Sequence, residues 1–570
     1  MARHVLRLFV VLAVVSALPA AAQPMDAHQL LAMYGEQVCR TLWEFHPVSA
    51  TASGCHDYDS LLGRYSPGDV KRTTRQLREH LESCEQLQPD WLTTDEQIDR
   101  ELLLSNIRME LFRLEQVSAW QRHPQFYADE CVQGVYYLLL REFAPLEERA
   151  RLATRRMRQV PRVMGEALRN VRNPPATYAA SAIGELSSGE EFFAQVARDL
   201  GEQFPDLKPE LDRSSKGAIK AMKGYRERLQ KLLPGLADDF AMGKANYDYM
   251  LKTDQFFDFD SDSLLRIGEL ALHWSDSLIQ RRTAAKARFD SLNPAPAEEY
   301  VAPPAGFGPA DFLAYEDAEA VTMRAWTTRE FATVPDEVGD ILARETPGFL
   351  RGIIPGLAME PPAPLDSVQT SYMYLGVLPD PFDSSAREQY WNTARSHGGR
   401  GGLVHEGFPG HHLQLSIANR HPSLIRQMQG NTTFIEGWAL YCEQAVTEQG
   451  LYPDDRFVSL RWLWGVRFRA ARVVLDVKLH KGQMTYDEAV RFMCDHFGDN
   501  EPYFRSEVRR YCLQPTQPMS YLVGKTQIMA LRREFEELQG DDFSLRDFHD
   551  RLLSEGSIPV SLIRRKLLSD

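Results

Sequence analysis

The chain has 570 residues with 65 basic and 79 acidic side chains, and loss of Arg3 and Arg7 with the first 22 residues would change its formal charge from −14 to −16. An acidic surface of this kind argues against a nucleic-acid partner. Seven cysteines are too few for a disulfide scaffold in so long a chain, although Cys39 could pair with Cys55 or Cys84 in an oxidising compartment.

The first 22 residues have the features of a signal peptide. Arg3 and Arg7 precede an apolar run at residues 8–18, and Ala20 and Ala22 are the small residues that suit cleavage. No later stretch approaches 18 unbroken apolar residues, so no membrane span is expected after cleavage. The sequence therefore predicts an exported protein, periplasmic or secreted. Because no cysteine follows the cleavage region, a lipid anchor is not indicated there.

From residue 26 onward the pattern predicts a mainly α-helical fold, because helical periodicity recurs between polar connectors and regularly spaced alternating strands are lacking. Residues 23–292 form an N-terminal helical region, residues 293–309 a Pro-rich loop, and residues 310–570 the metal-binding region of one continuous fold. The helices expected are Ala27–Trp43, Gly68–Gln86, Thr94–Gln121, Leu146–Asn170, Ala179–Leu200, Pro209–Leu236, Asp262–Leu292, Asp311–Thr327, Pro335–Thr346, Phe434–Glu448 and Phe457–Gly482.

Two segments outside these helices are informative. The polar cluster of His56, Asp57 and Asp59 lies either near an active site or, more commonly, in a turn held by aspartate side chains. Ser371–Leu375 is rich in aromatic residues and is expected to be an edge strand of a small sheet that runs past the metal. Its backbone and Tyr374 would there contact a peptide substrate.

A histidine–glutamate pair, His405-Glu406, begins like the zinc motif HExxH, but Pro409 stands where the second histidine belongs. On a straight helix His411 would lie roughly 120° around the axis from His405, and His412 about 10.5 Å along it. Neither position allows both imidazoles to reach one ion. The proline and the glycine after it predict a broken helix, which would bring one of the two later histidines back.

Glu436 completes the expected ligand set, because a catalytic zinc of this type takes two histidines, one carboxylate and a water. His405, His411 and Glu436 are therefore the expected ligands of one zinc ion, and Mn²⁺ or Co²⁺ would suit the same atoms. His412 is the alternative second ligand, or a group that supports a ligand or the transition state. Glu443, seven residues after Glu436 on the same helix face, is expected to orient a ligand.

Polar residues downstream offer further site candidates. Arg472, Asp476 and His480 recur every four residues, either as a ladder of salt bridges or as a stripe that lines the cleft, where His480 would donate to a substrate carbonyl or carboxylate. Arg472 and Gln517 are expected to contact the substrate. Tyr521 projects from a helix start and would stabilise an oxyanion, with core packing as the alternative.

These motifs resemble the bacterial family grouped as domain of unknown function 885, whose members look like zinc-dependent peptidases. The resemblance covers most of the mature chain and rests on Ala52–Asp59, His405–Gln414, Glu436–Tyr441 with Glu443, Arg472–His480 and Gln517–Gly524. The family is in turn similar to the helical peptidases typified by thimet oligopeptidase and angiotensin-converting enzyme, which enclose a zinc in a deep central channel. That relation supports Glu436 as a ligand and Tyr521 as an oxyanion donor. The chain departs from the family pattern at Thr516 and Pro518, where glycine and a small residue are frequent.

The sequence thus predicts an exported zinc-dependent peptidase that hydrolyses peptides or small peptide-like amides, with Glu406 as general base on the metal-bound water. A metal-dependent hydrolase of non-peptide amides or esters would use the same residues. A non-catalytic protein that holds a metal or a peptide would not need Glu406. A serine hydrolase is disfavoured, because no G-x-S-x-G elbow is found. The oligomeric state is left open.

Overall fold

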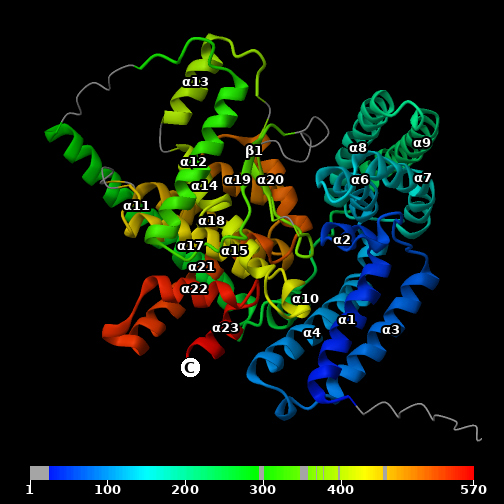
Figure 1. The fold of residues 1–570 in the computed structure, drawn as a ribbon, viewed down its shortest axis with the longest axis horizontal. Coiled ribbons are helices and arrows are strands. Elements are labelled where there is room, and N and C mark those ends of the chain that lie inside the picture. The colour runs from blue at the N-terminus through cyan, green and yellow to red at the C-terminus, as the bar shows by residue number, and fades with distance from the viewer. Residues whose placement is uncertain are drawn as a thin grey trace, which may run out of the picture.

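The computed structural model describes residues 25–293, 301–346, 357–367, 369–376, 378–395, 398–452, 457 and 459–569, and in them α-helices predominate beside one small sheet. Figure 1 shows two parts: the helices of residues 27–232 lie together on one side, and the later helices surround the sheet on the other. The mainly helical prediction is confirmed. The predicted signal peptide at 1–22 and residues 294–300 of the Pro-rich loop lie outside the described residues.

The N-terminal part is built from long helices. Thr93 caps one of them by accepting from the backbone N–H of Glu96 (3.3 Å). The single helix predicted at Thr94–Gln121 is wrong, because a π-helical turn at Arg113–Val117 and a left-handed Ser118 with φ 50° divide it, and apolar periodicity does not register such a break. The bounds are α1 (Ala27–Phe45), α2 (Pro47–Ala52), α3 (Pro67–Gln86), α4 (Thr94–Phe112), α5 (Ala119–Arg122), α6 (Pro124–Leu140), α7 (Leu146–Asn170), α8 (Ala176–Gln203) and α9 (Lys208–Leu232).

Two helices before the Pro-rich loop pack with the later part of the chain. They are α10 (Lys244–Thr253) and α11 (Ser261–Leu292), and their buried residues share a core with α18 (Ser459–His480). Gly268 of α11 lies so close to α18 that a Cβ there would come within 2.8 Å of the Val473 side chain. α10 and α11 therefore pack with helices that follow the Pro-rich loop.

The C-terminal part contains a close helix crossing. A Cβ on Gly524 would lie 1.8 Å from the carbonyl oxygen of Thr433, and one on Gly437 would lie 2.5 Å from the backbone of Gly524. Only glycine allows backbones to approach in this way. The bounds in this part are α12 (Pro309–Glu330), α13 (Ser384–Arg395), α14 (Gly398–Glu406), α15 (His411–Ala418), α16 (Leu424–Gln427), α17 (Thr432–Glu448), α19 (Tyr486–Phe497), α20 (Glu501–Leu513), α21 (Gln517–Gln539), α22 (Leu545–Ser554) and α23 (Val560–Leu567).

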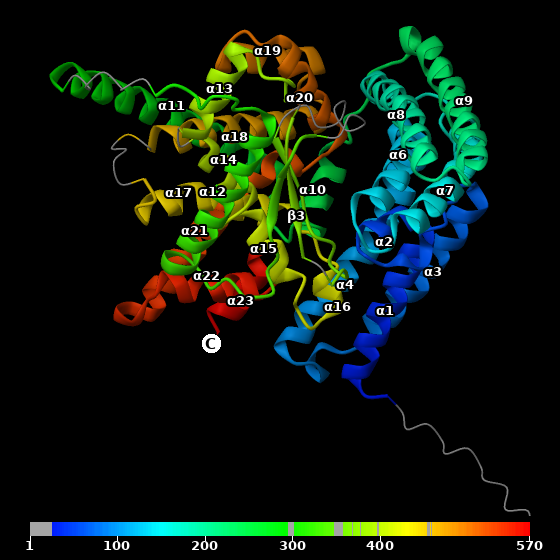
Figure 2. The same cartoon turned by 45° about the horizontal axis from the view of Figure 1, so that its top comes forward.

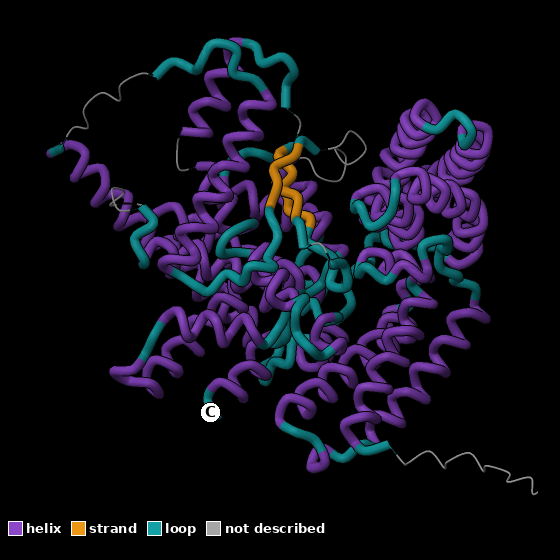
Figure 3. The backbone as a smooth tube through the Cα atoms, viewed as in Figure 1, coloured by secondary structure: helices purple, strands orange, loops and turns teal. Residues whose placement is uncertain are grey.

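The sheet has three strands in the order β1 (Ile341–Arg344), β3 (Ser371–Leu375) and β2 (Leu357–Glu360). Figure 3 shows them in orange, and Figures 1 and 2 place them between α12 and the N-terminal part. β3 pairs in parallel with β1 and antiparallel with β2, so the prediction that it is an edge strand is wrong. Nothing in the sequence of β3 indicates that it pairs on both sides.

The helix predicted at Pro335–Thr346 is also wrong, because that segment contains β1. Burial alternates along β1, with Ile341 and Ala343 inside, so pairing with β3 overrides the helix propensity of the local residues. β1 and β2 are the two edge strands of the sheet, with β3 between them. β2 lies against α14, where a Cβ on Gly402 would come within 2.9 Å of the Leu357 side chain.

The polar turn after α2 connects the two parts of the molecule. The ring nitrogens of His56 lie 2.9 Å from a carboxylate oxygen of Asp59 and 3.3 Å from one of Asp366, and the ring stacks on Phe143 at 3.8 Å. Burial lowers the pKa of His56, but the two carboxylates outweigh it and raise the pKa to about 9. The turn is therefore held by aspartate and also anchored to the loop between β2 and β3.

Two further predictions concern the whole chain. All seven cysteines are free, so neither pairing of Cys39 is present. None of the helices in the described part of the chain combines the length and the apolar character needed to span a bilayer.

Candidate metal centre

The helix that carries His405 ends at the next residue, and a new helix begins at His411. The predicted break is confirmed, but the reason given for glycine is different. Gly410 has φ −73°, and it must be glycine because a Cβ there would lie 2.0 Å from the carbonyl oxygen of His405. The indole N–H of Trp438 donates to the carbonyl of Pro409 (2.9 Å), which attaches the connection to α17.

The break brings His405, His411 and Glu436 together, with one ligand atom of each within 4.8 Å of the others. Oε2 of Glu436 lies 3.3 Å from Nε2 of His411 and 3.8 Å from Nε2 of His405. Ligands about 2.1 Å from a tetrahedral zinc are about 3.4 Å apart, so the observed spacing suits one such ion. The three side chains are 12%, 8% and 15% exposed, which leaves a small opening for water or substrate.

The Glu436 carboxylate is ionised in these surroundings. Burial raises its pKa, but the two imidazoles outweigh burial and lower the pKa to about 2. Its Oε2 atom is shielded from solvent and has no hydrogen-bond partner in the part of the chain that the structure describes. A buried carboxylate oxygen of this kind, directed at two imidazole nitrogens, has the chemistry of a cation ligand.

Glu443 orients His405. Its carboxylate accepts from the Nδ1–H of that imidazole (2.9 Å), so the Nε2 lone pair is free to face Glu436. Burial raises the pKa of Glu443, and the hydrogen bond from His405 together with Arg469 outweighs burial and lowers it. Arg469 is a residue that the sequence reading missed. It precedes Arg472 by three residues, so helical spacing could have found it.

His412 faces away from the ligands. Its Nδ1 accepts from the hydroxyl of Ser371 on β3 (2.7 Å), and its Nε2 donates to the carbonyl of Gly339 (2.8 Å). Burial lowers the pKa of His412 to about 4, so the ring is neutral. Because both nitrogens are occupied, the alternative in which His412 is the second ligand is wrong. Its role is to attach α15 to the sheet.

Tyr521 and Gln517, both near the start of α21, lie beside Glu436. The Gln517 amide is 3.5 Å from Oε1 of Glu436 and 3.3 Å from the hydroxyl of Tyr521. Burial and the Glu436 carboxylate raise the pKa of Tyr521, so the phenol keeps the proton that an oxyanion donor needs. The guanidinium of Arg472 packs over the Tyr521 ring at 4.1 Å.

Two arginines fix the orientation of the Gln517 amide. Its oxygen accepts from Arg472 (3.1 Å) and from Arg510 (2.9 Å), which turns its N–H groups toward Glu436. Arg510 belongs to α20, and no spacing in the sequence connects that helix to the motif. Gln517 therefore lies beside Glu436, and its contact with a substrate stays a prediction.

The start of α21 is set by Asp476 from the neighbouring α18. Its carboxylate accepts from the backbone N–H groups of Thr516 (3.2 Å) and Met519 (3.1 Å). Burial raises the pKa of Asp476 to about 7. Thr516 has φ 70°, a left-handed conformation that glycine adopts most easily.

Two expected site residues lie elsewhere. His480 is 1% exposed, donates from Nε2 to the carbonyl of Tyr511 (3.0 Å) and stacks on Tyr247, so its predicted role as a substrate donor is wrong. Eight residues, about 12 Å of helix, separate it from Arg472, which does reach the site. Tyr374 is 3% exposed on the central strand, so its predicted substrate contact is wrong as well.

Glu406 is the last residue of α14 and is partly exposed. In the described part of the chain it makes no hydrogen bond or ion pair with another side chain. Its role as general base on a water at the candidate ligands stays a prediction.

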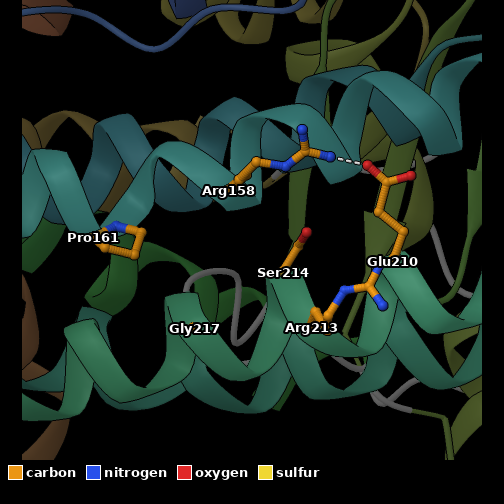
Figure 4. A pocket seen from close by; sticks show the side chains of 6 residues that line it. All are labelled: Arg158, Pro161, Glu210, Arg213, Ser214 and Gly217. Carbon is orange, nitrogen blue, oxygen red and sulfur yellow. Dashed lines mark ion pairs between the residues drawn. The ribbon is translucent and has the colours of Figure 1, made fainter.

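Cavities lie beside the site and away from it. One of about 170 Å³ adjoins Glu443, and one of about 450 Å³ lies between the two parts of the molecule and reaches Arg510. A cavity of about 510 Å³ between α7 and α9 contains an ion pair of Arg158 and Glu210 (Figure 4). Arg213 also lines this cavity, and its helices carry none of the three candidate metal ligands. The deep central channel stays a prediction.

Comparison with protein families matches residues 47–567 to a family described as "Bacterial protein of unknown function (DUF885)". Two solved structures, each described as a "putative lipoprotein", share the fold. The one from Shewanella oneidensis has a TM-score of 0.76 and 22% identity, and covers 96% of this chain and 100% of its own. The one from Colwellia psychrerythraea has a TM-score of 0.77 and 19% identity, and covers 96% and 99%. No curated protein matches the sequence.

Proposed function

The chain belongs to the DUF885 family of bacterial proteins, and we propose that it is an exported, zinc-dependent peptidase. The observation that carries the proposal is the convergence of His405, His411 and Glu436 within 4.8 Å. Two imidazoles and a carboxylate, with a glutamate directly after the first imidazole, are the groups of hydrolytic zinc sites. Export is supported by the signal-like N-terminal segment and by the lipoprotein descriptions of the two structural relatives.

The residues present fit a zinc ion. The two Nε2 atoms and Oε2 of Glu436 would hold it, and Glu443 already fixes the tautomer that leaves Nε2 of His405 free. When bound, zinc would lower the pKa of a coordinated water to about 7 and polarise a substrate carbonyl.

Glu406 is the proposed general base. It accepts a proton from the attacking water and transfers it to the nitrogen of the leaving amine, so the C–N bond breaks without a net change of protonation on the enzyme. Tyr521 donates its phenol O–H to the oxygen that becomes negative in the transition state. Gln517 and Arg472 position Tyr521, the first through its hydroxyl and the second against its ring face.

A peptide is the proposed substrate because an edge strand lies beside the helix that carries Glu406. β2 is at the edge of the sheet and packs against α14 through Leu357 and Gly402. An edge strand presents backbone donors and acceptors with which an extended peptide can pair. This arrangement favours peptides over esters without a backbone.

Turnover and zinc content of Glu406→Gln, measured together, test the proposal. We expect the purified variant to retain one zinc and to hydrolyse a mixed peptide library at least about 10²-fold more slowly than wild type. Glu388→Gln, an exposed substitution in α13, is the matched control and should behave as wild type. Full activity in Glu406→Gln would overturn the enzyme mechanism. Turnover of simple esters but not peptides would favour the non-peptide hydrolase.

A further inference from the structure

A second polar site lies between the two parts of the molecule. The cavity of about 450 Å³ there is enclosed by one face each of α6, α8 and α20, a size that suits a small ligand or a short piece of peptide. Its lining residues recur at helical spacing, so each helix contributes one continuous polar face. They include Gln125, Asp129, Gln133, Ser181, Glu185, Ser506, Arg509 and Arg510.

One wall of this cavity carries two carboxylates without a cation. Oε1 of Glu185 is shielded from solvent and has no hydrogen-bond partner among the described residues, and Asp129 accepts only from the Gln125 amide at 3.4 Å. Burial raises the pKa of Glu185 to about 7. Burial, with Glu185 adding to it, raises the pKa of Asp129. Carboxylates in such surroundings gain most from a positive group that comes with a ligand.

The opposite wall is basic. Arg509 makes no ion pair in the described part of the chain, whereas Arg510 pairs with Glu507 at 2.8 Å. The cavity therefore separates acidic groups on α6 and α8 from basic groups on α20. A peptide that enters would meet guanidinium donors for its carbonyl oxygens on one side and carboxylates for a cation on the other.

A chain of two hydrogen bonds links the lining of the cavity to the candidate metal centre. Arg510 lines it and donates to Gln517 (2.9 Å), and the Gln517 amide lies 3.5 Å from Glu436. A single side chain thus separates the cavity lining from a metal ligand.

We propose that this cavity determines substrate specificity, and that Asp129 and Glu185 bind a cationic group of the peptide. The inference rests on the proposed peptidase function and adds a substrate class to it. The group is an alkylammonium or guanidinium ion, supplied either by a lysine or arginine side chain or by a free α-amino terminus. Both sources present N–H donors to carboxylates in the same way.

Peptide binding tests this assignment without turnover if it is measured by calorimetry in the Glu406→Gln background. The probes are alanine hexapeptides of three kinds. The first has a free amino terminus. The second is a series of acetylated peptides with a single lysine placed at each position in turn, and the third is the same acetylated series with norleucine in place of lysine. We expect a cationic probe to bind at least about tenfold more tightly than the acetylated norleucine peptide. Asp129→Asn with Glu185→Gln should abolish this preference, and the exposed control Glu191→Gln should keep it.

The outcomes separate the two proposals. Preference for the free terminus alone would assign the cavity to the α-amino group, and preference for lysine alone would assign it to a side chain. Equal binding of all probes, or a preference that survives the double substitution, would overturn the inference even if zinc and peptidase activity are present. A preference found in a protein that binds no zinc would overturn the peptidase function and leave a cation-binding cavity.

Discussion

Substitution of Gly524 by alanine tests the helix crossing on which the site depends. The added Cβ would lie 1.8 Å from the carbonyl oxygen of Thr433, whereas Cβ atoms do not approach other heavy atoms within 3.0 Å, so α17 and α21 must separate by at least 1.2 Å. Overpacking of this kind costs about 1–3 kcal/mol. The separation would also move Tyr521 away from Glu436, and a displacement of about 1 Å in a site can lower turnover by about 10²-fold. Zinc should stay bound, because the candidate ligands lie on α14, α15 and α17 and keep their relative positions when α21 moves away from them.

Urea unfolding, zinc content and peptide turnover would be measured for this variant beside wild type. The control is Gly224→Ala on α9, where an added Cβ meets nothing within 4 Å. That variant should gain about 0.5–1 kcal/mol, because alanine loses less entropy than glycine in a helix. If Gly524→Ala is as stable and as active as wild type, the crossing does not position Tyr521, and the reasoning from backbone contact is refuted.

Three further predictions follow from single contacts. Glu443→Gln should weaken zinc binding about 10–100-fold in a chelator competition, because the charged partner of a ligand is lost; unchanged affinity would contradict its orienting role. Asp476→Asn should lower kcat more than it raises KM, because it loosens the start of α21; an effect on KM alone would contradict this. The carboxylates of Asp59 and Asp366 raise the folded-state pKa of His56 to about 9, so the stability that His56 contributes should be complete below pH 6.5 and lost as pH rises through about 9. Urea unfolding of wild type and His56→Ala across this range checks the sign, and a difference that grows with pH would contradict it.

Much of the candidate ligand set could be predicted because the chemistry of zinc restricts it. Two histidines and a carboxylate are recognisable by residue type, and Pro409 indicated that the helix breaks. The choice between His411 and His412 as the second ligand could not be made from the sequence. It depends on Ser371 and Gly339, which occupy both nitrogens of His412. The sequence predicted the strand that begins at Ser371, but not that this strand would contact His412.

The errors share a physical cause. Helical periodicity reports which residues share a face, but not which part of that face is covered by another helix. His480 was therefore grouped with Arg472, although the first is packed on Tyr247 and only the second reaches Tyr521. Strand order depends on contacts between distant segments, and for that reason the central position of β3 and the burial of Tyr374 were not predictable.

Zinc content by elemental analysis tests the central claim most directly, with purified wild type beside His411→Ala and His412→Asn. The ligand geometry predicts one equivalent of zinc in wild type, none in His411→Ala, and one in His412→Asn, because His412 supports the sheet and not the ion. Circular dichroism of the three proteins shows whether each is folded. No zinc in folded wild type after zinc is supplied, or equal loss in both variants, would contradict the proposed metal centre.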